Sequence, residues 1–330
     1  MHIGKGHSIL ITGGAGFIGA NLAEALSKSN RVRVIDNLST GNLDNLSVAR
    51  QNGCEWLEGD IRDFDLCRRA MQGIDYVLHQ AALGSVPRSI DDPLNTHAVN
   101  TTGFLNVLLA ARESRVKRIV YASSSSVYGD HPGLPKFEGE LGQPLSPYAV
   151  SKRCGEMYAQ CFAQLYAGMQ LIGLRYFNVF GKYQNPDGAY AAAVPKFIKA
   201  FIEHRSPVVS GDGEQSRDFT YVQNVVEANI CALSAKLPTS FHGVYNVACE
   251  ERYTLNALLT SIQQALGRYD AQIADIAIEY GQARRGDVKH SLASTEAIRM
   301  ELGYQGKWKL QAGLDASIEW YWNHLKTALA

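Results

Sequence analysis

Short apolar runs rich in β-branched residues recur through the first half of the chain. These runs, which we expect to form buried strands, are residues 9–12, 31–35, 76–79, 118–122 and 170–175. The segments between them carry apolar residues at helical spacing. Strands that alternate with helices in this way predict right-handed β-α-β units, and therefore an α/β fold with a doubly wound parallel sheet.

The pattern loosens in the second half of the chain. From about Asn178, glycine and proline interrupt the sequence and short mixed elements follow. The 330 residues also exceed the usual size of one domain. We therefore expect a main domain over residues 1–177 and a smaller mixed α/β lobe for substrate over residues 178–330. Residues 219–248 again have the pattern of sheet-associated pieces, so we expect them to return to the main domain.

Charge and composition narrow the possible partners. Lysine plus arginine equal aspartate plus glutamate at 32 each, so no net charge attracts nucleic acid or an anionic membrane. The six cysteines form no CxxC pair, which is typical of reduced thiols and predicts neither a disulfide nor a metal site. The sequence has no signal-peptide pattern and no apolar run of membrane length, so we expect a soluble cytoplasmic protein.

A glycine-rich turn follows the first predicted strand. Residues 13–19 read Gly-Gly-Ala-Gly-Phe-Ile-Gly and open a helix. Gly13 and Gly16 let the chain turn tightly and let backbone N–H groups approach a pyrophosphate at the helix N-terminus. Asp36 ends the second strand, where its carboxylate can accept both ribose hydroxyls and would repel a 2′-phosphate. The motif predicts a Rossmann-type domain that binds NAD rather than NADP, the alternative being a glycine turn without a nucleotide.

Other segments at the same edge of the sheet are candidates for cofactor contacts. Asp60 and Ile61 follow a short predicted strand and are expected to lie against the adenine. Residues 80–82 supply small side chains where backbone must pass close to the cofactor. We expect His79 to be a packed strand residue rather than a catalyst, because its neighbours are apolar. The Asn100 amide could tie its helix to the active-site backbone, although an ordinary surface asparagine fits the sequence equally well.

A phenol and an ammonium lie four residues apart after Pro147. Tyr148 and Lys152 therefore share one face of a predicted helix. A tyrosine base at neutral pH needs its pKa lowered by roughly three units from about 10, which Lys152 and a positive nicotinamide ring could supply. The serine run 123–126 ends a strand at the same carboxyl edge, where a hydroxyl can relay the proton of an alcohol. Taken singly, such a pair is usually solvated; together these groups predict a catalytic site.

With these motifs in place, the chain resembles the extended short-chain dehydrogenase/reductases, and within them the UDP-sugar 4-epimerases, most of all those that act on UDP-N-acetylglucosamine. The resemblance is carried, in order, by residues 12–19, 36–41, 59–63, the serine run, the Tyr-Lys pair, residues 175–179, residues 216–219 and residues 284–291. It implies that Tyr148 is the base, that Lys152 lowers its pKa and binds the nicotinamide ribose, and that Ser124 bonds the sugar 4-hydroxyl.

The resemblance and the motifs together give two sets of expected contacts. Those to a tightly bound NAD that is regenerated in each turnover are Gly13, Gly16, Phe17, Ile18, Asp36, Asn37, Asp60, Ile61, Gln80, Ala81, Ala82, Asn100, Ser123, Tyr148, Lys152 and Tyr176. Those to the substrate are Gly84, Ser85, Ser124, Ser125, Ser126, Tyr148, Asn178, Ala192, Val209, Arg217, Arg284, Asp287 and Ser291. No metal is expected. The neighbouring serines leave the register of the catalytic serine open.

The second half of the chain suits a diphosphate ligand. Asn178, Arg217 and Arg284 are donors scattered over predicted loops, and two guanidinium groups can bind one pyrophosphate, although each arginine alone is more often a surface ion pair. By resemblance, Asn178 and Arg217 hold the phosphates, Arg284 and Asp287 lie near them and the uridine ribose, and residues 208–211 flank the uracil.

Ser291 bears on which sugar is used. It is the sixth residue of the loop that begins Gly-Asp, where similar epimerases set the room beside the sugar C2 substituent. A small side chain leaves space for an N-acetyl group. The loop 84–89 and the run 188–193 also resemble epimerases of acetylated substrates. We therefore expect interconversion of UDP-N-acetylglucosamine and UDP-N-acetylgalactosamine or of their uronic acids, with UDP-glucose 4-epimerisation as the alternative.

Other functions on the same scaffold require residues or products that differ from those of an epimerase. Related 4,6-dehydratases place an Asp-Glu pair after the catalytic hydroxyl residue, where this chain has Ser125-Ser126. A decarboxylase or a reductase would release carbon dioxide or consume NADH. A non-enzymatic NAD-sensing scaffold commonly lacks one of the Tyr-Lys pair, and both are present here.

Apolar residues in 101–111 and 150–166 could form the four-helix seam of a homodimer, although burial against the sheet explains the same periodicity.

Overall fold

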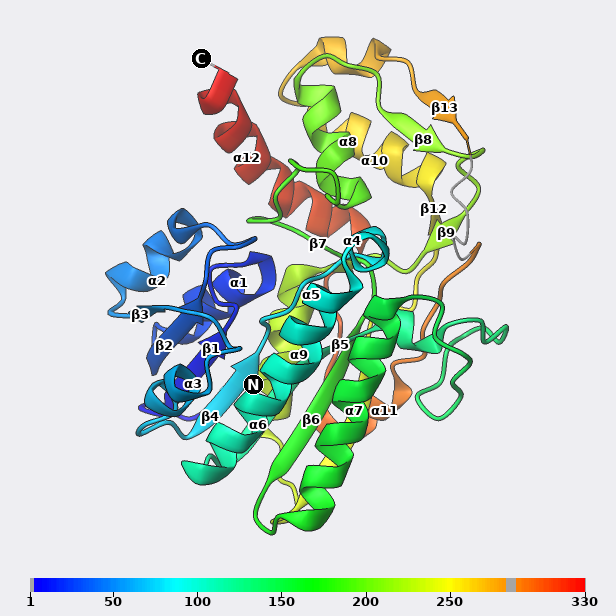
Figure 1. Ribbon diagram of the computed structural model, residues 1–330. Coiled ribbons are helices and arrows are strands. Elements are labelled where there is room, and N and C mark those ends of the chain that lie inside the picture. Colours follow the sequence, from blue (N-terminus) through cyan, green and yellow to red (C-terminus); the bar gives the residue numbers. More distant parts are fainter. Residues whose placement is uncertain (1–2, 283–288, 330) are drawn as a thin grey trace.

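The computed structural model describes residues 3–282 and 289–329 (Figure 1). A large lobe built on a central sheet occupies the lower part of the view, and a smaller, mainly helical lobe lies above it. Within the described residues, no helix has both the length and the apolar character needed to cross a membrane.

The central sheet has seven strands in the part of the chain that is described, all parallel to their neighbours. In chain order they are β1 (Ser8–Thr12), β2 (Arg31–Asp36), β3 (Glu55–Glu58), β4 (Tyr76–His79), β5 (Arg118–Ser124), β6 (Gln170–Tyr176) and β11 (Phe241–Val247). Their order across the sheet is β11-β6-β5-β4-β1-β2-β3, so the direction of winding reverses between β1 and β4. A ligand crevice is expected at the carboxyl ends of the strands beside such a reversal.

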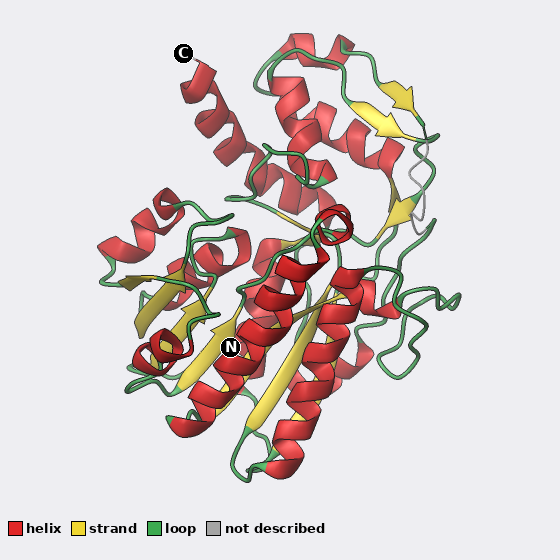
Figure 2. Cartoon of the chain, viewed as in Figure 1, coloured by secondary structure: helices red, strands yellow, loops and turns green. Residues whose placement is uncertain are grey.

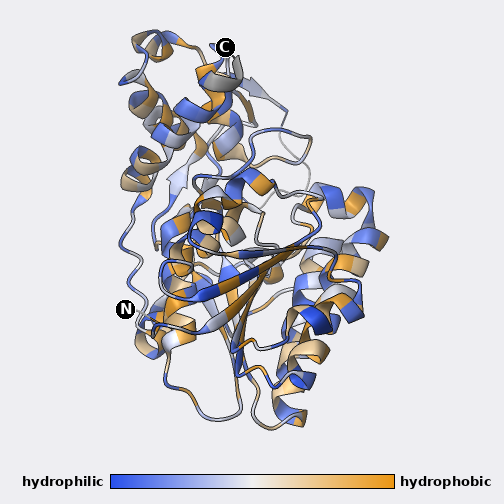
Figure 3. Ribbon diagram, turned by 90° about the vertical axis from the view of Figure 1, so that its left-hand side faces the viewer, coloured by the Kyte–Doolittle hydropathy of each residue, from blue (hydrophilic) through white to orange (hydrophobic). Residues whose placement is uncertain are grey.

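Helices cover both faces of this sheet, as the alternation of strands and helices predicts (Figures 1 and 3). One face carries α3 (Phe64–Ala70), α5 (Pro93–His97), the π-helical turn η2 (Ala98–Gly103), α6 (Phe104–Glu113) and α7 (Pro147–Leu165). The other carries α1 (Phe17–Leu26), α2 (Ser47–Gln51), α9 (Val222–Ser234) and α11 (Glu296–Leu302). Strand side chains alternate between the two cores: Leu10 packs toward α6, whereas Ile9 and Ile11 pack toward α1. The fold is therefore Rossmann-type.

The smaller lobe has its own core, which includes Phe201, Ile262, Leu314 and Tyr321. Its elements are α8 (Ala193–Ile202), β8 (Val208–Ser210), α10 (Leu255–Gly267), η4 (Ala271–Asp275), β13 (Glu279–Gly281) and α12 (Leu310–Leu329). Short strand pairs lie between the lobes: β7 (Val179–Phe180) with β10 (Thr220–Tyr221), and β9 (Ser216–Arg217) with β12 (Tyr253–Thr254). The remaining short elements are η1 (Leu43–Leu46), α4 (Val86–Asp91) and η3 (Ser125–Tyr128).

The five predicted strands all lie in the central sheet (Figure 2). The chain returns to this sheet after the smaller lobe has begun, because α9 packs on it and β11 pairs with β6 at its edge. The helix expected after Pro147 is α7, and its start follows from local chemistry. The Ser146 hydroxyl accepts the N–H of Ala149, and Pro147 occupies the first turn, where its missing N–H has no cost.

Candidate active site

A cavity of about 370 Å³ lies at the carboxyl ends of β1, β2, β4 and β5, beside the reversal in strand order. It brings together every expected cofactor residue except Asn100. The residues concerned are Gly13, Gly16, Phe17, Ile18, Asp36, Asn37, Asp60, Ile61, Gln80, Ala81, Ala82, Ser123, Tyr148, Lys152 and Tyr176. Of the expected substrate contacts, Gly84 and Ser124 also line it.

The glycine turn forms one wall of this cavity, and Gly13 and Gly19 leave no room for a side chain. Gly13 has φ +68°, and a Cβ there would lie 2.5 Å from the backbone nitrogen of Ala81. A Cβ on Gly19 would lie 2.2 Å from the carbonyl oxygen of Gly13. The turn therefore holds bare backbone against β4 and directs the N-terminus of α1, which follows Gly16, toward the cavity. Such a terminus suits a pyrophosphate.

Asp36 supplies the acid at the end of β2. It is 9% exposed, and its carboxylate oxygens accept the N–H groups of Ala15 at 3.0 Å and Leu38 at 2.8 Å. Burial raises its pKa, and these backbone bonds oppose that rise. Because each carboxylate oxygen accepts more than one hydrogen bond, Asp36 can still accept ribose hydroxyls. The cavity therefore fits NAD: a bare glycine turn for the phosphates and a fixed carboxylate for the ribose.

Asn100 and His79 stabilise the walls of the cavity. The Asn100 side chain accepts the N–H of Leu83 at 2.7 Å and donates to the Leu83 carbonyl at 3.1 Å and to Ser151 Oγ at 3.1 Å. These bonds tie α7 to the backbone after β4, which is one of the two roles expected for Asn100. The amide makes them outside the cavity, which Asn100 does not line. His79 is packed, with Thr12 Oγ1 2.7 Å from its Nδ1, and burial lowers its pKa to about 3.

Tyr148 and Lys152 lie together on the first turns of α7. The Lys152 Nζ is 5.9 Å from the centre of the Tyr148 ring and donates to the Ala122 carbonyl at 2.8 Å. Burial lowers the pKa of Lys152 to about 8, and the negative charge of Glu156 opposes that shift. Both side chains line the cavity beside Ser124. The phenol, the ammonium and the hydroxyl thus converge as the sequence predicts.

The pKa of Tyr148 is raised in the protein, whereas the sequence predicts that it is lowered. Burial raises this pKa above its ordinary value, and a hydrogen bond with the Ser124 hydroxyl lowers it in part. The prediction that Lys152 lowers this pKa is not met in the protein alone, because removal of the phenolate from water outweighs the hydroxyl that stabilises it. A net lowering of this pKa therefore needs positive charge beyond what the protein alone places here, such as that of a bound nicotinamide ring.

The serine run separates into different roles. Ser123 is 3% exposed and donates to Glu156 Oε1 at 2.6 Å, away from the phenol. Ser124 bonds Tyr148, and its Oγ accepts the N–H of Ser126 at 3.1 Å and the Ser126 hydroxyl at 3.0 Å. Ser125 and Ser126 belong to the following turn, η3, and do not line the cavity. Among the four serines, the geometry favours Ser124 as the partner of Tyr148.

A buried ion pair behind the site was missed in the sequence. Arg175 donates to both Glu156 oxygens at 2.8 Å each, and their side chains are 3% and 7% exposed. The same guanidinium donates to the Tyr128 hydroxyl at 3.1 Å. The sequence feature that could have indicated it is the position of Glu156, which lies one helical turn after Lys152 and therefore on the same face of α7. The pair fixes α7 to β6 next to Tyr148 and Lys152.

A second cavity, of about 720 Å³, adjoins the first, and Val179 lines both. It contains three of the expected substrate residues, Asn178, Ala192 and Arg217. Val208 and Ser210 of β8 line it as well, whereas Val209 points into the core of the smaller lobe and is 0% exposed. The expectation for Val209 is thus corrected for its side chain, because neighbouring residues of a strand point to opposite faces.

Of the remaining expected substrate residues, Ser85 and Ser291 line neither cavity, and the others lie outside the described residues. Ser85 caps α4, where its Oγ accepts the N–H of Arg88 at 3.3 Å, and it lines neither cavity. Ser291 follows a bridge between His290 and Ser216, and its N–H donates to the Ser216 carbonyl at 3.0 Å. Arg284 and Asp287 lie outside the described residues.

Comparison with known proteins accounts for this arrangement. Residues 9–248 match the family described as the NAD dependent epimerase/dehydratase family. The chain belongs to this family. A putative UDP-glucose 4-epimerase of Methanocaldococcus jannaschii is 34% identical over 97% of this chain and 100% of its own length. The family assignment makes NAD the cofactor of this epimerase family member, which agrees with the glycine turn and Asp36 at the first cavity.

Solved structures of the epimerase family match the whole fold. The UDP-N-acetylglucosamine 4-epimerase of Methanobrevibacter ruminantium M1, solved with UDP-N-acetylmuramic acid, has a TM-score of 0.90 and 37% identity, covering 97% of this chain and 99% of that one. The UDP-glucose 4-epimerase of Thermus thermophilus, solved with NAD, has a TM-score of 0.83 and 33% identity, covering 95% and 98%. The relatives thus include 4-epimerases of both plain and acetylated UDP-sugars.

Proposed function

We propose that this epimerase family member interconverts UDP-N-acetylglucosamine and UDP-N-acetylgalactosamine by inverting C4 through a transient 4-keto sugar. The observation that carries the proposal is the meeting of Tyr148, Lys152 and Ser124 in the cofactor cavity, directly beside a second, larger cavity. The chemistry expected of bound NAD is the reversible acceptance of a hydride at its nicotinamide ring.

The protein's own groups manage the proton and the position of the sugar. Tyr148 as phenolate takes the proton of the 4-hydroxyl as the hydride leaves C4, and returns it when the hydride comes back to the opposite face. Ser124 holds the sugar oxygen near the phenol. Lys152, fixed by the Ala122 carbonyl, provides the positive charge beside the phenolate.

Inversion requires that the two ends of the substrate be held differently. The keto sugar must turn to present its second face, so the diphosphate has to bind firmly while the hexose is held loosely. Arg217 and Asn178 in the second cavity are suited to the diphosphate, because their donors can offset its negative charge. Gly84, which has no side chain, and Ala192, which has only a methyl group, line the cavities and leave the hexose room.

The preference for an N-acetyl group rests on Ser291. The segment that carries it bonds to Ser216, next to Arg217, and two residues later Ala293 packs in the cluster with Val127 and Tyr128. Ser291 therefore lies on a path from the diphosphate side to the turn after Ser124. The similarity to the Methanobrevibacter ruminantium enzyme supports the same preference, and the Thermus thermophilus and Methanocaldococcus jannaschii relatives keep UDP-glucose as the second candidate.

Turnover without added cofactor tests the proposed function. Purified protein is incubated with UDP-N-acetylglucosamine, UDP-glucose or a UDP-N-acetylhexosaminuronate, and the 4-epimer is followed by NMR. We expect the acetylated hexosamine to be converted fastest and no net NADH to form. A strong preference for UDP-glucose would contradict the choice of sugar. Release of carbon dioxide, loss of water or bound NAD without turnover would identify a decarboxylase, a dehydratase or an NAD-sensing scaffold instead.

Replacing Ser291 by tyrosine is expected to lower kcat/KM for UDP-N-acetylglucosamine at least about tenfold, with little change for UDP-glucose, because the larger side chain overlaps only the N-acetyl group. Initial rates on both sugars measure the effect. The matched control is Ser291→Ala, which keeps the space and should keep the preference. Equal losses on both sugars would show that Ser291 does not sense the C2 substituent.

We further propose that two copies associate through α7 and α6 as a four-helix seam. Along α7, Val150, Met157 and Leu165 are 47%, 61% and 68% exposed, and Cys161 lies between them. The opposite face of α7 packs on the sheet, so this apolar stripe is additional to the buried one. An exposed stripe of this length favours a helix partner.

Met157→Glu is expected to convert the dimer to a monomer, because it places a charge in the middle of that stripe. Light scattering coupled to size-exclusion chromatography gives the mass directly. Met300→Glu is the matched control, since Met300 is 81% exposed on α11, on the opposite face of the sheet. A wild-type protein that runs as a monomer at micromolar concentration would remove the proposal.

A further inference from the structure

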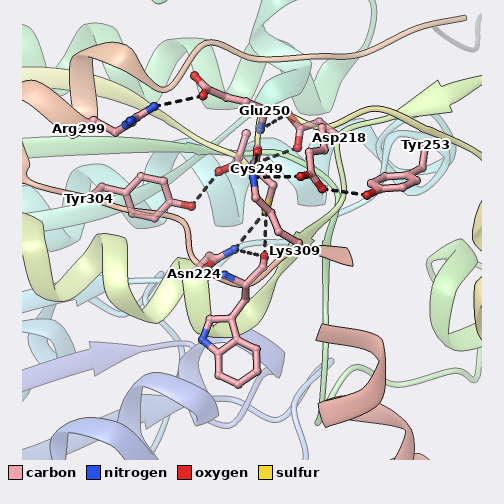
Figure 4. Close-up of polar contacts among 11 residues, drawn as sticks. Asp218, Asn224, Cys249, Glu250, Tyr253, Arg299, Tyr304 and Lys309 are labelled. Carbon is pink, nitrogen blue, oxygen red and sulfur yellow. Dashed lines mark hydrogen bonds and ion pairs between the residues drawn. The ribbon is translucent and has the colours of Figure 1, made fainter. Parts of the chain in front are cut away.

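Asp218 is a buried carboxylate in the short link between β9 and β10. It is 0% exposed and lines neither cavity in the described part of the chain. Its Oδ1 accepts the N–H of Cys249 at 2.9 Å, and its Oδ2 accepts the N–H of Glu250 at 3.1 Å (Figure 4). Oδ2 also accepts the N–H of Ala293 at 3.4 Å. One side chain thus joins the exit of β11 to the segment that contains Ser291.

The backbone of Asp218 is bonded to the residues suited to the diphosphate. Its carbonyl accepts the side-chain amide of Asn178 at 3.1 Å, and the carbonyl of Asn178 accepts the N–H of Thr220 at 3.3 Å. Arg217, the preceding residue, lies in β9 and lines the second cavity together with Asn178. The carboxylate therefore anchors, from behind, the stretch of chain that presents both donors.

The geometry calls for a carboxylate rather than any other polar group. Three N–H donors converge on two oxygens, and an amide of the same shape would direct its own NH₂ toward at least one of them. Glu250 has φ +57°, a backbone conformation that a residue with a side chain rarely adopts, and in that conformation its N–H donates to Asp218. Burial raises the pKa of Asp218 to about 6, and the three N–H donors oppose that rise.

We propose that Asp218 is the positioning residue for diphosphate binding: it fixes Asn178 and Arg217 at the second cavity by clamping β9 to the exit of β11 and to the segment after residue 288. It touches neither the reacting carbon nor the cofactor cavity. The inference rests on the proposed function for the identity of the ligand, and it assigns Asp218 to substrate affinity rather than to chemistry.

Asp218→Asn in the full-length protein is expected to raise KM for UDP-N-acetylglucosamine at least about tenfold, because one backbone donor loses its acceptor and the clamp loosens. The NAD content per chain and kcat at saturating substrate should stay within about threefold, since the cofactor cavity is formed by other segments. Titration calorimetry with UDP alone should give the same loss of affinity, without any turnover.

Asp75→Asn is the matched control. Asp75 also accepts a backbone N–H, that of Ser8 at 3.0 Å, but at the amino ends of β1 and β4, away from both cavities. A merely structural role for Asp218 would make the two variants alike, with lower melting temperatures and unchanged KM and UDP affinity, and would overturn the proposal. Loss of NAD together with activity in Asp218→Asn would overturn it as well.

The outcomes separate this inference from the proposed function. If the wild-type protein converts no UDP-sugar, the function fails, and the UDP affinities still test the clamp. If Asp218→Asn gives no folded protein, Asp218→Ser carries the same expectation, because its single hydroxyl takes less room and leaves at least one of the three donors without an acceptor. UDP affinity equal to wild type in either folded variant would refute the clamp.

Discussion

Replacing Tyr148 by phenylalanine is expected to lower kcat for 4-epimerisation by about 10²–10⁴-fold, the range that a positioned acid–base group contributes. The substitution removes only the oxygen that bonds Ser124 and leaves the ring beside Lys152 in the cavity wall. Among the described residues, Tyr148 is the only phenol lining the cavity that has both a lysine and a serine hydroxyl beside it. The proton of the 4-hydroxyl therefore has no alternative acceptor of the same kind.

The measurement compares kcat, NAD content and UDP affinity in the variant and the wild type. Only kcat should change, because the remaining contacts of cofactor and diphosphate are untouched. Tyr166→Phe is the control: the same substitution at the far end of α7, where the ring packs on Phe162 and Arg112. If Tyr148→Phe turned over every accepted sugar as fast as wild type, the mechanism proposed above would be wrong.

The convergence of the candidate catalytic groups could be predicted from the sequence because local rules fix their places. The glycine turn, Asp36 and the Tyr-Lys spacing each depend on a few neighbouring residues and on the fact that parallel strands end at one edge. The separation of Ser123 from Ser124 could not be predicted, because it depends on Glu156, which reaches β5 only after α7 packs on the sheet. Spacing alone also gave no sign that burial would raise the pKa of Tyr148.

The same distinction applies to the fold. The five strands expected from apolar runs, β1, β2, β4, β5 and β6, are all present in the central sheet, which has a hydrophobic core on each face. The strand pairs between the lobes have two residues each, too short for any periodicity, and their partners lie far away along the chain. Asp218 falls in this stretch. Its importance comes from three distant N–H groups, which no local pattern indicates.

Replacing Glu156 by alanine is expected to lower the free energy of unfolding by about 3–5 kcal/mol, the cost of removing one partner from a buried ion pair. The Arg175 guanidinium would keep its charge with 3% of its side chain exposed and lose both carboxylate oxygens. Ser123 would lose its acceptor as well. The Lys152 pKa should fall below about 8, because the Glu156 charge that now raises it would be gone.

Urea unfolding followed by circular dichroism measures the stability loss, and an exposed pair provides the scale. Arg33 and Glu55 link the neighbouring strands β2 and β3, with Nε 2.7 Å from Oε2, but Glu55 is 52% exposed, so Glu55→Ala should cost at most about 1 kcal/mol. The double variant Glu156→Leu/Arg175→Met removes both charges and should recover much of the stability lost in Glu156→Ala. Recovery should be incomplete, because Arg175 also donates to the Glu138 carbonyl at 2.8 Å. A loss in Glu156→Ala no larger than that in Glu55→Ala would mean that water reaches Arg175 and that the pair does not hold α7 to the sheet.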